Sequence, residues 1–190
     1  MNTIDNFNFN NKKTIVRVDF NVPIEHDKVT DNSRIVAAKT TIEKIISDGG
    51  SCILMSHLGR PKGYDNNLSM QKIHAEVESV LKTKVILSRD IVGSDSVMKA
   101  KNLSNGQVLL LENLRFHKEE TEGDLAFAKK LSSLADCYVN DAFGTAHRAH
   151  ASTTIIAQFF ENKFFGSLLE KEVKSIEKVM KSGEKPILAI

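Results

Sequence analysis

The stretch from Cys52 to Pro61 constrains the fold more than any other part of this sequence. It begins with the apolar run Cys52-Ile53-Leu54-Met55 and continues without a spacer into the turn Ser56-His57-Leu58-Gly59-Arg60-Pro61. A short apolar run closed by Gly and Pro predicts a strand that is buried on both faces. In an open parallel sheet, ligands bind outside the carboxyl ends of the strands. Because His57 and Arg60 can both donate charge-assisted hydrogen bonds, the turn predicts a site for a phosphate or a carboxylate.

The rest of the chain repeats this alternation of strand, polar turn and helix. Strands are predicted at 13–19, 52–55, 85–87, 108–111, 137–139 and 186–190, and a small hairpin at 25–30. Amphipathic helices are predicted after Ser33 up to Gly49, from Ser69 to Leu81, and at 95–101, 124–135 and 167–181. Such alternation is typical of an α/β fold with a mostly parallel sheet and right-handed crossovers. All strand exits then lie along one edge of the sheet.

The distribution of arginine supports an anion site at that edge. Only six of the 26 basic residues are Arg, and four of the six follow strand-like runs or open a helix: Arg34, Arg60, Arg115 and Arg148. Arginine suits bidentate recognition of anions, whereas scattered solvated charge is more often Lys. We therefore expect these four, with Asp19, Asn21 and His57, to surround one crevice.

Each of these residues also has an ordinary structural interpretation. Asp19 and Asn21 commonly stabilise turns. Arg34 lies in the first turn of a helix, where the helix dipole disfavours a cation, but a solvent-exposed Arg would tolerate that position at little cost. Arg115 could form a surface salt bridge with Glu119 or Glu120. Taken one at a time, the residues leave both interpretations open.

Bulk properties exclude several classes of function. The formal net charge is only +2, with no basic run, which argues against nucleic-acid binding. The two cysteines, Cys52 and Cys137, lie in or beside apolar runs and are expected to be buried free thiols. His147 and His150 lack further ligands at a recognised spacing, so we expect no metal site and a structural role for His150. We see no signal peptide or membrane span, and therefore expect a cytoplasmic protein without a membrane partner.

Four motifs, in order and with matching spacing over nearly the whole chain, resemble the N-terminal half of the phosphoglycerate kinase family. They are Arg17-Val18-Asp19-Phe20-Asn21-Val22-Pro23, Ser56-His57-Leu58-Gly59-Arg60-Pro61, Leu111-Glu112-Asn113-Leu114-Arg115-Phe116, and Asn140-Asp141-Ala142-Phe143-Gly144-Thr145-Ala146-His147-Arg148-Ala149-His150. The resemblance implies a three-layer αβα lobe, with a Rossmann-like sheet of about six strands and helices on both faces. Several long motifs in register are far more specific than one short pattern.

The family resemblance implies an enzyme of glycolysis that transfers a phosphoryl group reversibly between ATP and the carboxylate of 3-phosphoglycerate. It implies substrate contacts from Asp19, Phe20, Asn21, Arg34, His57, Leu58, Gly59, Arg60, Arg115 and Arg148. Arg34 would be the catalytic arginine. Residues 1–183 would form the substrate-binding domain, in which the helix at about 167–182 connects the two lobes.

Residues 184–190 would begin a second, truncated domain. The Lys, the Mg²⁺ ligand and the Gly-rich loop that bind Mg-ATP or Mg-ADP in this family have no counterpart in the sequence. We therefore expect a fragment that binds 3-phosphoglycerate but is inactive alone, and whose uncovered apolar surface promotes self-association. A stand-alone, non-catalytic anion-binding module remains the alternative. A dinucleotide-binding domain is disfavoured, since no Gly-rich fingerprint follows the first strand.

Overall fold

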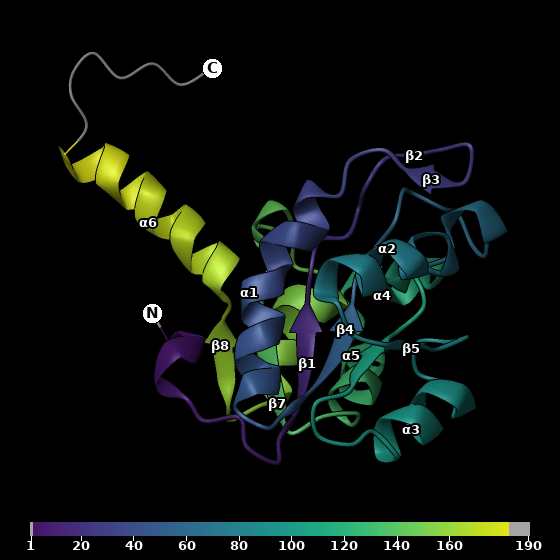
Figure 1. The fold of residues 1–190 in the computed structure, drawn as a ribbon, viewed down its shortest axis with the longest axis horizontal. Coiled ribbons are helices and arrows are strands. Elements are labelled where there is room, and N and C mark those ends of the chain that lie inside the picture. Colours follow the sequence, from purple (N-terminus) through teal and green to yellow (C-terminus); the bar gives the residue numbers. More distant parts are fainter. Residues whose placement is uncertain (1, 183–190) are drawn as a thin grey trace.

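A six-stranded parallel sheet forms the centre of the protein, which we describe from a computed structural model covering residues 2–182 (Figure 1). Its strands, in spatial order, are β5 (Val85–Leu87), β6 (Val108–Leu110), β4 (Ser51–Met55), β1 (Lys13–Arg17), β7 (Cys137–Asn140) and β8 (Lys163–Phe165). Every neighbouring pair in this sheet is parallel. All six carboxyl ends therefore lie along one edge, as the alternating sequence pattern predicts.

Helices cover both faces of the sheet and make three layers. The two helices on one face are α1 (Ser33–Ser47) and α2 (Gln71–Leu81). The other face is covered by α3 (Ser94–Lys101), α5 (Leu125–Ser132) and the short turns of Ala151–Phe159. Successive strand residues alternate between the two cores, with Val16 and Leu54 in the first and Ile15 and Ile53 in the second. This alternation explains why the strands are continuous apolar runs.

The predicted elements match the structure except at some ends. The hairpin is present as β2 (Ile24–Glu25) and β3 (Lys28–Val29). The first strand ends at Arg17, two residues before the predicted end, and α5 ends at Ser132, three residues early. The predicted strand at 186–190 lies outside the described residues. Within residues 2–182, no helix is long and apolar enough to cross a membrane.

Two elements were missed by the sequence prediction. One is the edge strand β8, whose three residues pair with β7. The other is the short helix α4 (Lys118–Glu122). Only Phe164 of β8 is buried, and its neighbours Lys163 and Phe165 are exposed. An edge strand of three residues offers too little periodicity to be distinguished from a loop.

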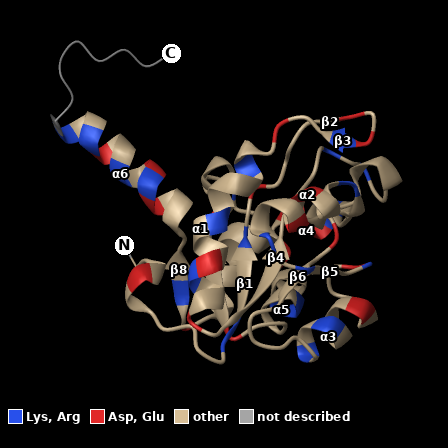
Figure 2. Ribbon diagram, viewed as in Figure 1, with Lys and Arg blue, Asp and Glu red and all other residues tan. Residues whose placement is uncertain are grey.

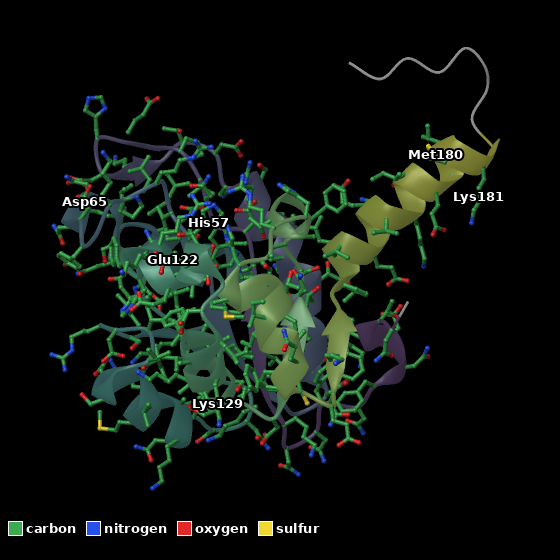
Figure 3. The ribbon with its side chains drawn as sticks, turned by 180° about the vertical axis from the view of Figure 1, so that it is seen from behind. His57, Asp65, Glu122, Lys129, Met180 and Lys181 are labelled. Atoms are coloured by element: carbon green, nitrogen blue, oxygen red, sulfur yellow. The ribbon has the colours of Figure 1, made fainter. Side chains whose placement is uncertain are left out.

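Helix α6 (Ser167–Ser182) projects away from the body of the protein (Figures 1 and 3). Its start is fixed by Asp141, whose Oδ1 accepts hydrogen bonds from the backbone N–H groups of Leu168 and Leu169 at 2.9 and 3.2 Å. Burial raises the pKa of Asp141, and these hydrogen bonds oppose the rise. The carboxylate thus caps the helix N-terminus, where the helix dipole favours negative charge.

The outer part of α6 is amphipathic but largely uncovered. Charged residues of both signs alternate along it (Figure 2). Apolar Ile176, Val179 and Met180 remain 49%, 48% and 79% exposed. Self-association through this surface stays a prediction.

Candidate functional site

Turns from four neighbouring strands meet at the carboxyl edge of the sheet. They follow β1, β4, β6 and β7, and they carry the site residues expected from the sequence except Arg34, which lies in α1. A cavity of about 700 Å³ opens there. Its lining residues are Arg60, Pro61, Lys62, Gly63, Arg115, Phe116, His117, Lys118, Glu119, Thr121, Arg148 and His150. The structure therefore places three of the seven residues expected at the crevice around one hollow, next to several further basic side chains. The other four do not line this cavity: Asp19, Asn21, Arg34 and His57.

The turn after β4 is held by Asn113, a buried residue that follows β6. Its Oδ1 accepts from the backbone N–H of Leu58 at 3.2 Å, and its Nδ2 donates to the carbonyls of Leu58 and Leu68 at 2.7 and 2.8 Å. The next residue, Gly59, accepts a hydrogen bond from Arg115 at 2.7 Å and donates one to Asn21 at 2.8 Å. The main-chain groups of Leu58 and Gly59 thus position the turn, and any substrate contact from them remains a prediction.

We expect the substitution Gly59→Ala to lower the free energy of unfolding by about 1–2 kcal/mol or more, because its φ of +62° is unfavourable for any residue with a Cβ. A Cβ on Gly59 would also lie 2.7 Å from a methyl carbon of Leu68. The matched control is Gly106→Ala, which has a φ of +79° but no neighbouring atom within 4 Å. Urea unfolding should show a larger loss for Gly59→Ala; equal losses would mean that the Leu68 contact contributes nothing.

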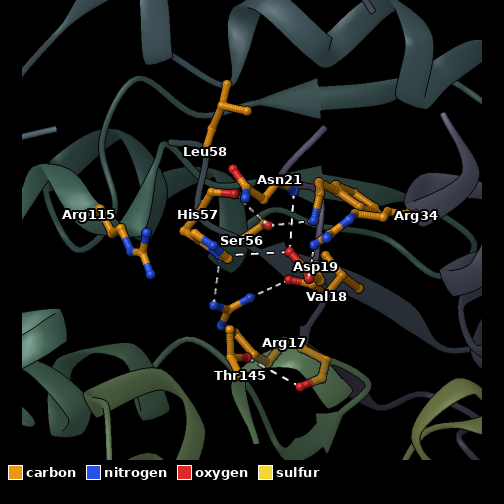
Figure 4. Close-up of polar contacts among 12 residues, drawn as sticks. Arg17, Val18, Asp19, Asn21, Arg34, Ser56, His57, Leu58, Arg115 and Thr145 are labelled. Carbon is orange, nitrogen blue, oxygen red and sulfur yellow. Dashed lines mark hydrogen bonds and ion pairs between the residues drawn. The ribbon is translucent and has the colours of Figure 1, made fainter. Parts of the chain in front are cut away.

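In the turn after β1, Asp19 both stabilises the turn and contacts Arg34, another residue expected at the site. Asp19 Oδ1 accepts from the backbone N–H of Asn21 at 3.3 Å, which is the turn chemistry expected of Asp. Its other oxygen forms an ion pair with Arg34 from the first turn of α1 (Figure 4). The Arg34 side chain nevertheless remains 51% exposed. Phe20, also expected at the site, is fully buried, and its N–H donates to Ser56 Oγ at 2.8 Å.

Arg115 does not form the surface salt bridge that its neighbours in sequence suggested. Its guanidinium turns toward Gly59, and among the described residues no ion pair joins it to Glu119 or Glu120. Burial lowers the pKa of Arg115, and the charges of Arg148, Arg17 and Arg60 lower it further. Four guanidinium groups are therefore close enough to repel one another, which is the electrostatic condition for binding an anion.

His57 lies between these arginines and is almost completely buried. Burial, followed by the charges of Arg17, Arg115, Arg148 and Arg34, lowers the pKa of His57 to about 2. The imidazole is consequently neutral at physiological pH. His57 can serve the site as a hydrogen-bond donor but supplies no charge.

A fully buried arginine, Arg17, was not among the site residues expected from the sequence. Its guanidinium contacts His57 Nδ1 at 3.1 Å and donates to the Val18 carbonyl (Figure 4). It also donates to Ser152 Oγ at 2.9 Å. Ser152 in turn donates to the buried carboxylate of Glu120 at 2.6 Å. The sequence feature that could have identified Arg17 is its position as a single Arg within a run of β-branched residues that otherwise predicts a buried strand.

The two histidines after β7 have different surroundings. His150 is partly buried, with Nδ1 3.7 Å from Glu120 Oε1, but it also lines the cavity, so its structural role stays a prediction. His147 is exposed and accepts a hydrogen bond from Arg148 Nε at 3.3 Å. In the described part of the chain, no group of three or more His, Cys, Asp or Glu side chains is arranged to hold a metal ion. Both cysteines are buried free thiols, as predicted.

The fold and the cavity define an α/β protein with a cationic hollow at the carboxyl edge of a parallel sheet. A family model described as phosphoglycerate kinase matches residues 4–190. The chain therefore belongs to the phosphoglycerate kinase family, as its motifs suggested.

Individual relatives agree with this assignment. A phosphoglycerate kinase of Porphyromonas gingivalis is 48% identical over 99% of this chain and 51% of its own length, and one of Moorella thermoacetica is 50% identical over 99% and 48%. Solved phosphoglycerate kinases of Pyrococcus horikoshii and Coxiella burnetii, each 33% identical, superpose with TM-scores of 0.88 and 0.84. They cover 98% and 97% of this chain, which covers 47% and 46% of theirs. The chain thus spans about half the length of the relatives it matches.

Proposed function

We propose that this chain is the substrate-binding half of a cytoplasmic phosphoglycerate kinase and that its cavity holds 3-phosphoglycerate. The observation that carries the proposal is the convergence of Arg60, Arg115 and Arg148 on one cavity. Guanidinium groups bind phosphate through paired, charge-assisted hydrogen bonds. Asp19 and Asn21, on the adjacent turn, would receive the glycerate portion of the substrate.

The proposed reaction is transfer of a phosphoryl group between ATP and the carboxylate of 3-phosphoglycerate, giving 1,3-bisphosphoglycerate. The attacking carboxylate is already ionised at neutral pH, so no general base is needed. Catalysis then depends on alignment and on stabilising the charge in transit. This requirement suits a site built from arginines and a neutral histidine.

Arg34 is the proposed catalytic arginine of this half. In the structure it is paired with Asp19, whose side chain is only 13% exposed, while half of the Arg34 side chain is exposed. Solvent around the Arg34 end weakens an ion pair of this kind. Arg34 could therefore leave Asp19 for the phosphoryl group once the substrate is bound.

The second substrate, Mg-ATP, would bind to the other half of the enzyme. We assign no nucleotide or Mg²⁺ ligand to residues 2–182, which contain no suitable cluster of His, Cys, Asp or Glu. We propose that α6 connects the two lobes and that residues 184–190 begin the second. This partition predicts binding without turnover for the chain alone.

Titration calorimetry of the 190-residue chain tests the proposal. D-3-phosphoglycerate should bind at a single site, more tightly than inorganic phosphate or D-glycerate, because each of these lacks one of the two anionic ends. Phosphoglycerate binding no tighter than that of inorganic phosphate would favour a general anion-binding module instead. Mixing the chain with Mg-ATP and 3-phosphoglycerate should yield no measurable ADP.

A further inference from the structure

The contact between Arg17 and His57 determines which ring nitrogen of the histidine carries a proton. Arg17 Nη2 lies 3.1 Å from His57 Nδ1, a hydrogen-bond distance. A guanidinium has only donors and no acceptor. Nδ1 must therefore accept through its lone pair, and the proton of the neutral ring must be on Nε2.

The competing arrangement would place a proton on Nδ1 and direct it to Asp19. Asp19 Oδ1 lies 3.9 Å from Nδ1, which is too far for a hydrogen bond. The other oxygen of Asp19 is already paired with Arg34. The geometry therefore favours Arg17 as the partner of Nδ1.

The orientation of Arg17 is itself fixed by a directional chain of hydrogen bonds. Its Nε donates to Ser152 Oγ at 2.9 Å, so the single hydroxyl proton of Ser152 is free to point elsewhere. That proton goes to Glu120 Oε1 at 2.6 Å, and the Ser152 N–H donates to Oε2 at 3.0 Å. The hydrogen bonds thus run in one direction, from Arg17 to Ser152 and from Ser152 to Glu120, and they hold the guanidinium with its Nη2 toward His57.

The surrounding charges reinforce the neutral state of the ring. The groups that face His57 are Arg17 in β1, Asp19 after it, Arg34 in α1, Arg115 after β6 and Arg148 after β7. Four cations against one carboxylate, itself paired with Arg34, disfavour an imidazolium. Among the described residues nothing hydrogen-bonds to Nε2, which is left to donate to a ligand.

We propose that Arg17 is a positioning residue that fixes His57 as the Nε2–H tautomer, so that the site presents a neutral donor to its anionic substrate. The claim about substrate rests on the proposed function. The claim about the tautomer does not, because it follows from contacts in the ligand-free chain. Arg17 itself, fully buried behind His57, acts only through that ring.

Nuclear magnetic resonance of the chain with ¹⁵N-labelled histidine tests this directly. The chain has six histidines, and the spectrum of a His57→Gln variant identifies the signals of His57 by their loss. We expect His57 to remain in the Nε2–H form, without titrating, over about pH 5 to 8, where an ordinary histidine changes charge. A protonated Nδ1, or titration of His57 within that range, would overturn the proposal.

A variant then separates Arg17 from the general effect of burial. In Arg17→Met, His57 loses the donor to Nδ1, so we expect an Nδ1–H population to appear and the pKa of His57 to rise. Arg89→Met is the matched control, since Arg89 is 85% exposed and pairs with Asp95. An unchanged His57 spectrum in folded Arg17→Met would refute the role of Arg17. Should that variant fail to fold, the double variant Glu120→Gln with Arg17→Met, which removes both buried charges, takes its place, and an unchanged His57 spectrum refutes the role of Arg17 in the same way.

Adding 3-phosphoglycerate distinguishes this proposal from the proposed function. A shift of the His57 Nε2 and H–Nε2 signals on titration would support both. The expected tautomer together with no response to 3-phosphoglycerate would refute the proposed ligand, while supporting the control of the tautomer by Arg17.

Discussion

Replacing Glu120 with Gln is expected to lower the free energy of unfolding by about 3–5 kcal/mol, the usual cost of removing one partner from a set of buried charges. Glu120 is 1% exposed and accepts two hydrogen bonds from Ser152. Of the charges that raise the pKa of the buried Arg17 against the lowering effect of burial, that of Glu120 has the largest effect. A neutral amide would remove that charge and leave Asp19 as the remaining carboxylate that opposes the effect of burial on Arg17.

Urea unfolding monitored by circular dichroism measures the loss, and Glu119→Gln is the control. Glu119 adjoins Glu120 in α4, but its side chain is 40% exposed and its contact is with His117. We expect the control to change stability by no more than about 0.5 kcal/mol. The double variant Glu120→Gln with Arg17→Met should be less destabilised than the sum of the single variants, because it removes both charges. Simple additivity would mean that the two groups do not compensate each other.

The same substitution should change how stability depends on pH. Burial opposes ionisation of Glu120, but the polar interaction with His150, the charge of Arg17 and the hydrogen bonds from Ser152 outweigh it, so its pKa is lowered. A carboxyl group with a depressed folded pKa stabilises the protein above its unfolded pKa, about 4.3, and loses that contribution as the pH falls through the folded value. Glu120→Gln should therefore weaken the acid sensitivity of unfolding, whereas Glu119→Gln should not.

The sequence was sufficient to predict which turns meet at one edge of the sheet. Parallel strands must end at one edge, so the exits bearing Arg60, Arg115 and Arg148 could be brought together without coordinates. The sequence did not indicate which side chains at that edge are buried and which line the cavity. Arg17 and Arg115 are the same residue type near strand ends, yet one is fully buried and the other lines the cavity. That difference is set by the tertiary partners Glu120 and Ser152, which lie more than 100 positions away from Arg17 in the chain.

The hydrogen bonds made by main-chain groups at the site could not be predicted from the sequence either. The motif around His57 suggests that Leu58 and Gly59 meet the substrate, whereas their N–H and C=O groups are engaged by Asn113, Asn21 and Arg115. Those bonds connect turns from three strands, and no local pattern encodes them. They join the three turns into a single hydrogen-bonded unit at the edge of the sheet.

Replacing Arg60 with Ala is expected to weaken binding of 3-phosphoglycerate about 10- to 150-fold, which corresponds to the loss of roughly 1.5–3 kcal/mol from a hydrogen bond to a charged group. Arg60 is exposed at the cavity, so its removal leaves no buried partner unsatisfied and should leave the unfolding midpoint unchanged. A loss of affinity would then report contact with the ligand. Raising the salt concentration should reduce the difference, since exposed charges are screened.

Arg89→Ala removes the same charge from a site away from the cavity and is the matched control for calorimetry. If the effect of Arg60 came only from net charge, the two variants would weaken binding equally. If Arg60 binds the phosphate, Arg89→Ala should leave the dissociation constant within about twofold of the wild type, because long-range attraction between exposed charges is largely screened at physiological salt. Equal dissociation constants of wild type and Arg60→Ala for 3-phosphoglycerate would show that Arg60 does not contact the ligand. The cationic cavity would then need another residue, such as Arg115 or Arg148, to hold the phosphate.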